Sequence, residues 1–116
     1  MTTFINLTQH EITIKNSDID VTVQPSGMLA RVSTSELDAG SVAGIPVIRR
    51  AMGKVDLCLD RDQIDTDTVL LVSSMVLEAI PVGHDLLPFC FAPDTGETAT
   101  RNDKGHVKSV SRLVGK

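Results

Sequence analysis

Aromatic residues are nearly absent from this chain of 116 residues. It contains no Trp and no Tyr, and its three Phe residues are Phe4, Phe89 and Phe91. The core must therefore be aliphatic, built from Val, Ile, Leu and Met. Single-stranded nucleic acids stack their bases on exposed rings, so this scarcity argues against a nucleic-acid-binding platform.

Positive charge and long apolar runs are also scarce. The formal net charge is −4 at pH 7, whereas binding to DNA, RNA or anionic membrane depends on a basic surface. A small anionic ligand needs only one or two arginines and some backbone N–H groups. No apolar run approaches the ~20 residues of a membrane helix, and no signal peptide pattern stands at the start. We expect a cytoplasmic protein whose partners include neither a nucleic acid polymer nor a membrane.

Metal-ligating and redox motifs are missing as well. Cys58 and Cys90 lie far apart and form no C-x-x-C pattern, so free thiols are expected, with one disulfide as the alternative. The histidines His10, His84 and His106 stand at no known metal-ligand spacing. The acidic segment 60–68 lacks the glycine and terminal glutamate of a calcium-binding loop. The sequence therefore predicts no metal and no cofactor.

Alternation of polar and apolar residues with period two is the main structural signal. It recurs in short segments separated by turn residues every eight to twelve positions, a spacing typical of antiparallel all-β domains. Residues 34–44 are small and polar and are expected to form a mobile loop. The sequence predicts a single domain, 1–116, that is mainly β: a small antiparallel sandwich or barrel of 8–9 short strands with one short helix. The strands are expected at residues 4–7, 11–15, 19–24, 28–33, 45–50, 55–59, 69–72, 86–92 and 107–114. Hairpins are expected at 11–24, at 45–59 with a turn at 52–54, and at the C-terminal end with a turn at 102–105.

The stretch 69–101 is the part around which the chain is organised. It opens with the most apolar run, residues 69–72, which predicts a buried strand. Ser73 or Ser74 follows as a helix N-cap, and the helix is expected to end before Pro81. The start of such a helix exposes unpaired N–H groups that can receive an anion. A second strand, 86–92, leads into the polar loop 93–101.

Three interpretations of the loop 93–101 are open. Its Asp94-Thr95-Gly96 triplet matches aspartic proteases, but those enzymes need two such loops, and this chain has one copy. A type I turn is a second interpretation, since Pro93 suits the second position of such a turn. The third is a ligand loop, in which threonine hydroxyls, backbone N–H groups and Arg101 hold an anion.

Other candidate groups are isolated. His84 and Asp85 form an acid–base dipeptide, which is also a common turn composition. The serines 73 and 74 lack the G-x-S-x-G elbow of esterases. Arg31, Arg49 and Arg50 are cations that either converge on a site or simply face solvent, and adjacent strand residues point in opposite directions.

Five motifs occur in order along the chain: N-L-T-x-H-x-I at residues 6–12, P-S-G-x-x-A-R-V at 25–32, G-I-P-V-I-R at 44–49, V-S-S-x-V at 72–76 and P-D-T-G-x-T-A-x-R at 93–101. This pattern resembles a group of small uncharacterised proteins from tailed phages and prophages. The resemblance implies a phage origin and a location in the host cytoplasm, and it brings no established activity. The ligand-binding candidates, combined from these motifs and the helix start, are Asn6, His10, Ser26, Arg31, Ser73, Ser74, Asp94, Thr95, Gly96, Thr98 and Arg101.

The sequence thus predicts a non-enzymatic phage protein that binds and sequesters a small anionic, nucleotide-like signalling ligand as a counter-defence, with assembly into a homo-oligomer. Three alternatives remain open. The first is an inhibitor that binds a host protein. The second is a hydrolase of a nucleotide signal that uses His84, Asp85 or Asp94, and the third is a minor virion or assembly component. No catalytic residue is assigned, because no nucleophile, base and cationic clamp occur together in a known pattern.

Overall fold

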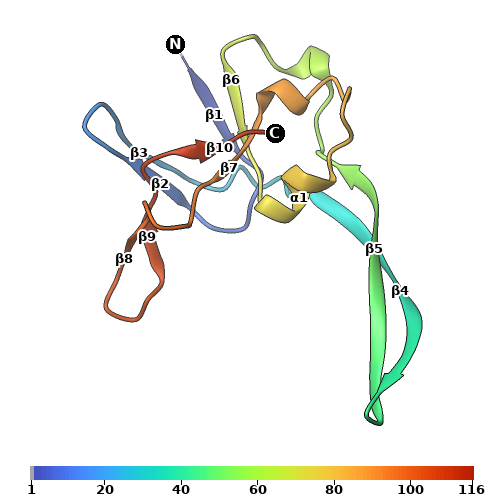
Figure 1. Ribbon diagram of the computed structural model, residues 1–116. Coiled ribbons are helices and arrows are strands. Elements are labelled where there is room, and N and C mark those ends of the chain that lie inside the picture. The colour runs from blue at the N-terminus through green and yellow to red at the C-terminus, as the bar shows by residue number, and fades with distance from the viewer. Residues whose placement is uncertain (1) are drawn as a thin grey trace.

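The computed structural model describes residues 2–116, and within them the chain is mainly β, with 46% of its residues in strands and 10% in helices (Figure 1). This confirms the predicted fold class, including its short strands and one short α-helix. The strands are β1 (Thr3–Asn6), β2 (Ile12–Lys15), β3 (Asp20–Val23), β4 (Arg31–Val42), β5 (Ile45–Asp56), β6 (Thr68–Leu71), β7 (Cys90–Pro93), β8 (Thr100–Arg101), β9 (Val107–Ser109) and β10 (Leu113–Val114). The helices are α1 (Ser74–Ala79) and two 3₁₀ turns, η1 (Arg61–Gln63) and η2 (Leu87–Phe89).

The central sheet has the strand order β1-β6-β7-β10 and is mixed rather than purely antiparallel. β6 pairs parallel with both β1 and β7, and only β10 runs antiparallel to its neighbour β7. A parallel pair needs a crossover of a dozen or more residues, usually a helix, and the segment 72–89 with α1 supplies it. The remaining strands form three separate two-stranded sheets, so no closed barrel forms among residues 2–116.

The core lies between β6 and α1 and is aliphatic, as the composition predicts. Leu70 and Val72 are fully buried and pack with Leu77, Ile80 and Leu86. Burial of one such side chain contributes roughly 1.5–3 kcal/mol. The buried run at residues 69–72 thus fixes the centre of the fold.

Helix α1 begins and ends where the sequence predicts. The Ser73 hydroxyl accepts a hydrogen bond from the N–H of Val76 at 3.3 Å, so Ser73 is the N-cap. Ile80 ends the helix in an extended conformation, and Pro81 follows. Val76 and Leu77 face the core, while Met75 and Glu78 face solvent.

Two of the antiparallel hairpins are confirmed. β2 pairs with β3 in the register Ile12↔Val23 to Lys15↔Asp20. β8 pairs with β9 across the predicted turn 102–105. The expected last strand, 107–114, is divided: β9 pairs with β8, Val110 bridges to Ile14, and β10 joins the central sheet beside β7.

The prediction of a mobile loop at residues 34–44 is wrong. Residues 34–42 belong to strand β4, which pairs antiparallel with β5 with two register shifts; each strand is 12 residues long. The chain reverses at Ala43 and Gly44, whose φ angles of 52° and 79° suit the primed two-residue turn of a hairpin. Gly53, expected in a turn at 52–54, lies instead in β5 at a register shift, where an added Cβ would come within 2.4 Å of the Ser33 hydroxyl.

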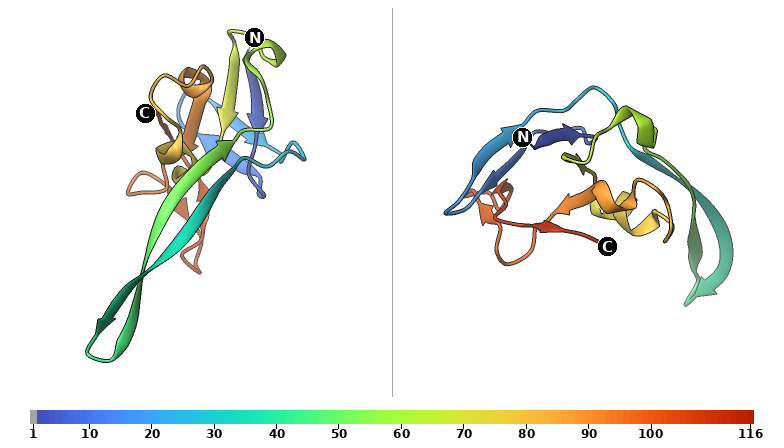
Figure 2. Two further views of the ribbon diagram at one scale, coloured as in Figure 1. Left: turned by 90° about the vertical axis from the view of Figure 1, so that its right-hand side faces the viewer. Right: turned by 90° about the horizontal axis from the view of Figure 1, so that it is seen from above.

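The outer part of this hairpin, residues 33–54, is called the arm. At its base Val32 and Val55 pack against the core, but the arm itself extends away from the body (Figures 1 and 2). The radius of gyration is 16.7 Å, whereas about 13 Å is typical of a compact chain of this length. The helices within residues 2–116 include none long and apolar enough to cross a membrane.

Candidate functional site

A cavity of about 530 Å³ lies where the loop after β1, the start of β4 and the beginning of α1 meet; it is called the α1 pocket. Ligand pockets in proteins commonly have volumes of about 300–1,000 Å³. Most of the surface that lines this one is aliphatic, and no carboxylate takes part. The lining residues are Leu7, Thr8, Gln9, His10, Leu29, Ala30, Arg31, Val32, Ser73, Met75 and Val76.

Three motifs that are far apart in the sequence meet at the α1 pocket. N-L-T-x-H-x-I supplies residues 7, 8 and 10, P-S-G-x-x-A-R-V supplies residues 30–32, and V-S-S-x-V supplies residues 73 and 76. Parallel pairing of β1 with β6 brings the ends of these two strands to the same edge of the central sheet. The backbone N–H of Ala30 donates to the carbonyl of Leu7 at 2.9 Å, and this bond fixes the start of β4 beside the loop.

The loop 7–10 is shaped by Asn6, which is fully buried. Its Oδ1 accepts hydrogen bonds from the N–H of Thr8 at 2.9 Å and from the Thr8 hydroxyl at 2.6 Å. Its Nδ2 donates to the carbonyls of His10 at 2.8 Å and Val23 at 3.0 Å. An asparagine amide offers two donors and two acceptor positions, so all four are occupied. The structure places Asn6 behind the pocket wall, with no capacity left for a ligand.

His10 and Arg31 are the ionisable residues of the α1 pocket. Both are exposed, and neither side chain has a hydrogen-bond or ion-pair partner in the part of the chain that the structure describes. Arg31 stands opposite Asp56 in the β4–β5 register, yet the two side chains form no ion pair. A guanidinium and an imidazole beside an aliphatic wall can receive an anion and an apolar ring of the same ligand.

Ser73 lines the α1 pocket, but Ser74 does not. Because the Ser73 hydroxyl accepts the N–H of Val76, the anion-receiving helix start expected at this point is partly occupied by the cap itself. The Ser73 hydroxyl keeps its own hydrogen to donate. Ser74 contributes instead to a second cavity, beside Glu78 and the C-terminal residues.

Ser26 and its neighbours hold the segment that leads into β4. The Ser26 hydroxyl donates to the carbonyl of Asn6 at 2.8 Å and accepts from the N–H of Met28 at 3.2 Å. Gly27, with φ at 93°, and Pro25 line a smaller cavity that shares Arg31 with the α1 pocket. Ser26 therefore positions a pocket wall, while Arg31 lies between the two hollows.

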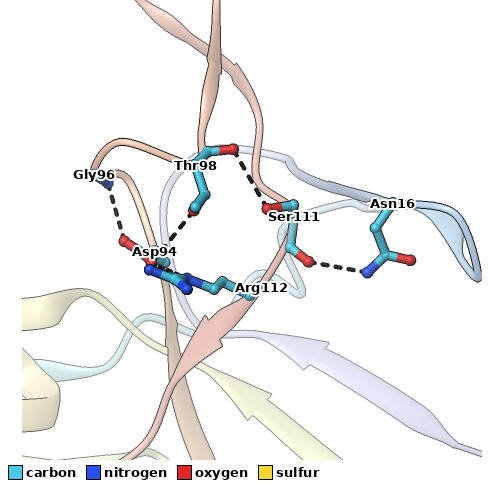
Figure 3. A network of polar contacts seen from close by, with 6 residues as sticks. All are labelled: Asn16, Asp94, Gly96, Thr98, Ser111 and Arg112. Carbon is cyan, nitrogen blue, oxygen red and sulfur yellow. Dashed lines mark hydrogen bonds and ion pairs between the residues drawn. The ribbon is translucent and has the colours of Figure 1, made fainter.

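The loop 93–101 forms a separate polar network (Figure 3). The Asp94 carboxylate pairs with the Arg112 guanidinium, accepts the N–H of Gly96 at 3.0 Å and accepts the Thr98 hydroxyl at 3.4 Å. The hydrogen bond from Arg112 lowers the pKa of Asp94 below its ordinary value of 3.8, and the Gly96 N–H lowers it further. Ser111 links this network to β2–β3, because its hydroxyl donates to Thr98 and its carbonyl accepts from Asn16.

Arg101 forms its hydrogen bonds within the same region, between the loop 93–101 and the turn that follows it. Its guanidinium donates to the carbonyl of Thr95 at 2.7 Å and to the carbonyl of Gly105 at 2.8 Å. Both bonds hold the loop 93–101 against the turn 102–105. None of Asp94, Thr95, Gly96, Thr98 and Arg101 lines the α1 pocket. Of the predicted ligand residues, His10, Arg31 and Ser73 line the α1 pocket, Asn6 and Ser26 support its walls, Ser74 lines the second cavity, and the other five belong to the separate network of the loop 93–101.

The structure does not bring together the three residues of the hydrolase alternative, His84, Asp85 and Asp94. His84 Nδ1 lies 3.4 Å from Asp85 Oδ1, but it also lies 3.1 Å from the N–H of Leu86, which it accepts. A nitrogen that accepts an amide hydrogen carries no proton of its own to share with the carboxylate. Asp94 is absent from the cavity that His84 and Asp85 line. Among residues 2–116, no group of three or more His, Cys, Asp or Glu side chains is placed to hold a metal ion.

The two thiols are free, and they differ in environment. Cys58 is exposed, and its thiol donates to the carbonyl of Leu29 at 3.3 Å. Cys90 is buried in the core, and burial raises the pKa of its thiol to about 11. The Cys90 thiol therefore lacks the exposure and the lowered pKa that mark a reactive cysteine.

The aliphatic lining of the α1 pocket was not singled out by the sequence. Leu29 and Met75 look like core positions when only periodicity is considered, and Thr8 and Gln9 look like turn residues. The available signal was that the N-L-T and A-R-V motifs combine apolar residues with polar ones at the ends of strands. Comparison with known proteins adds no assignment, since no protein-family model, curated protein or solved structure matches this chain.

Proposed function

We propose that the protein binds a small anionic organic ligand in the α1 pocket and does not transform it. The observation that carries this proposal is the presence of two unpartnered basic side chains, Arg31 and His10, on one aliphatic cavity of about 530 Å³. An apolar ring or base fits the wall, and a phosphate or carboxylate fits the guanidinium. Nucleotides and related phosphate-bearing signals combine these two parts.

Binding without turnover is favoured by the chemistry of the lining residues. No Asp or Glu lines the pocket, so no carboxylate is present to orient His10 as a base. The Ser73 hydroxyl is engaged by the helix N-terminus, which leaves it poorly suited as a nucleophile. A binding protein needs only the apolar wall and the cationic groups. The phage origin, the host-cytoplasm location and a counter-defence role remain predictions from the motif resemblance.

Isothermal titration calorimetry with a panel of phosphate-bearing compounds and one uncharged control tests this function. The panel contains a nucleoside monophosphate, a nucleoside diphosphate, a cyclic dinucleotide, the matching uncharged nucleoside and inorganic phosphate. We expect at least one phosphate-bearing compound to bind stoichiometrically and to be recovered unchanged after heat denaturation. Binding of none of them, or many turnovers per chain, contradicts the proposal.

The matched variants are Arg31→Gln and Lys104→Gln, which remove the same charge. Lys104 is exposed in the turn 102–105, outside the pocket. A charge-assisted hydrogen bond contributes about 1.5–3 kcal/mol, so Arg31→Gln should weaken binding by about 10- to 150-fold. Lys104→Gln should leave the dissociation constant within about twofold. Equal effects of the two substitutions would show that only net charge matters.

A further inference from the structure

The α1 pocket adjoins the smaller cavity beside it, which has a volume of about 330 Å³ and is called the Met28 cavity. The volumes of both lie within the range of about 300–1,000 Å³ that is common for ligand sites. The two cavities have a common wall, formed by the loop after β1 and the segment that leads into β4. The residues that line both are Thr8, Gln9, Leu29 and Arg31. The cavities are therefore two lobes of one groove, and a single ligand can occupy both.

Each lobe has an apolar wall of its own. Met75 lines the α1 pocket and is 51% exposed. Met28 lines the other lobe together with Pro25, and neither of these two residues lines the α1 pocket. A methionine side chain is flexible, and its polarisable sulfur makes favourable contacts with aromatic rings. Each lobe is therefore suited to one planar ring.

The common wall carries the free polar groups of the groove. The side chains of Arg31 and Gln9 are exposed, and neither has a hydrogen-bond or ion-pair partner within residues 2–116. A guanidinium offers N–H donors in a planar fork, and a side-chain amide offers two further donors. No Asp or Glu lines either lobe. A phosphate between the lobes can thus receive donors from both side chains without repulsion from a lining carboxylate.

The number of cations favours one type of phosphate. Arg31 is the only Lys or Arg among the residues that line the two lobes. A phosphate monoester carries a charge of about −1.5 to −2 at pH 7 and has a single substituent, so it would leave one lobe empty. A phosphodiester carries one negative charge, and its two ester oxygens lead to two substituents. It therefore matches one guanidinium between two lobes.

Hydrogen bonds fix the backbone of both lobes. The Cys58 thiol donates to the carbonyl of Leu29 in the common wall at 3.3 Å, and the Ser26 hydroxyl accepts from the N–H of Met28 at 3.2 Å. A wall that is already ordered lowers the entropic cost of binding. We propose that the groove binds one ligand in which a phosphodiester joins two ring-bearing groups, with the phosphate at Arg31 and one ring in each lobe. This inference rests on the proposed function of the α1 pocket.

Isothermal titration calorimetry tests it with ligand pairs that differ in the second nucleoside. The probes are the four homodinucleoside monophosphates, each matched with the methyl ester of the corresponding nucleoside 5′-monophosphate. Both members of a pair carry one negative charge, but the methyl ester has only one ring-bearing group. Because a second ring adds contacts in the Met28 cavity, we expect at least one dinucleoside monophosphate to bind about tenfold or more tightly than its methyl ester.

Met28→Ala and Met75→Ala truncate the same side chain in the two lobes. Met28→Ala should reduce the advantage of the dinucleoside monophosphate to about threefold or less. It should leave the affinity for the methyl ester unchanged, because a single ring takes the larger lobe. Met75→Ala should weaken the binding of both compounds. Far-UV circular dichroism checks that each variant is folded, since Met28 packs against the core. The comparison in wild type needs no variant, and it decides the proposal if Met28→Ala does not fold.

The outcomes distinguish this inference from the function on which it rests. Equal affinities within every pair overturn the ligand with two rings, but they leave the binding of an anion in the α1 pocket intact. An advantage that Met28→Ala does not change also overturns the inference, because the second ring would then lie outside the Met28 cavity. Binding of no phosphate-bearing compound contradicts the proposed function as well.

Discussion

Asn6 Nδ2 donates a hydrogen bond of 2.8 Å to the backbone carbonyl of His10, and so the buried end of β1 holds the loop that lines the α1 pocket. The same amide also ties β1 to the carbonyl of Val23 at the end of β3. One side chain therefore connects the central sheet, the β2–β3 hairpin and the pocket. This relationship separates residues that build the pocket from residues that can touch a ligand.

Substitution of Asn6 by Ala should destabilise the protein. Asn6→Ala removes the amide hydrogen bonds to Thr8, His10 and Val23, and the loss of a buried hydrogen-bonding group costs about 1–3 kcal/mol. Since the chain has no Trp or Tyr, urea unfolding is followed by far-UV circular dichroism. Gln9→Ala is the control: Gln9 is exposed, and we expect a change within about 0.5 kcal/mol. Equal stability of Asn6→Ala and wild type would contradict this role.

The pKa of Asp94 depends on Arg112. The guanidinium hydrogen bond is the largest cause of the lowered pKa of Asp94. In the unfolded chain that carboxyl titrates near its ordinary value, 3.8, so the stabilisation from this group is present above that pH and is lost as pH falls through the lower folded pKa. Arg112→Gln should raise the pKa of Asp94 toward 3.8. Carboxyl NMR titration measures it, and an unchanged value would exclude Arg112 as the cause.

Much of the body was predictable, because local signals and packing agree there. The apolar run 69–72, the Ser73 cap and Pro81 each correspond to an observed strand, helix start or helix end. The parallel pairing of β1 with β6 was not predictable. It joins segments more than 60 residues apart, and alternation within a strand carries no information about the direction of its neighbour.

The sequence pattern did not predict the arm or the roles of the polar site residues. Strand β4 beyond Val32 has both faces in solvent, so the residues from Thr34 to Gly40 show no alternation. Asn6 and Arg101 were predicted as ligand-binding residues, but their hydrogen bonds go to the protein's own backbone. Sequence alone cannot distinguish a polar group that binds a ligand from one that organises a loop.

The buried thiol of Cys90 should react far more slowly than that of Cys58. Burial raises the pKa of Cys90 from 9.0 to about 11, so the reactive thiolate is rare at pH 8. Peptide mapping by mass spectrometry after iodoacetamide treatment should find Cys58 modified first and Cys90 only in denaturant.

The raised pKa of Cys90 also gives the direction in which pH changes the stability of the fold. Between 9.0 and about 11 the unfolded thiol loses its proton before the folded one does, so this group lowers the stability as pH rises.

Gly44 should be required for the arm to stay paired. Its φ of 79° lies in the left-handed region, where a residue with a Cβ pays roughly 1–2 kcal/mol. Gly44→Ala should therefore increase local opening of β4 and β5, while the central sheet remains protected. Amide hydrogen exchange measures this as faster exchange in residues 34–52 alone.

Ser41→Ala provides the control for Gly44→Ala. Ser41 lies in the same part of β4, is exposed, and lacks a positive φ. Its exchange pattern should match wild type, because neither the turn nor a buried contact changes. If Gly44→Ala also left the exchange of β4 and β5 unchanged, the Ala43–Gly44 turn would not be what sets their register. If exchange rose across the central sheet as well, the arm and the body would unfold as one cooperative unit, which the solvent on both faces of the ribbon argues against.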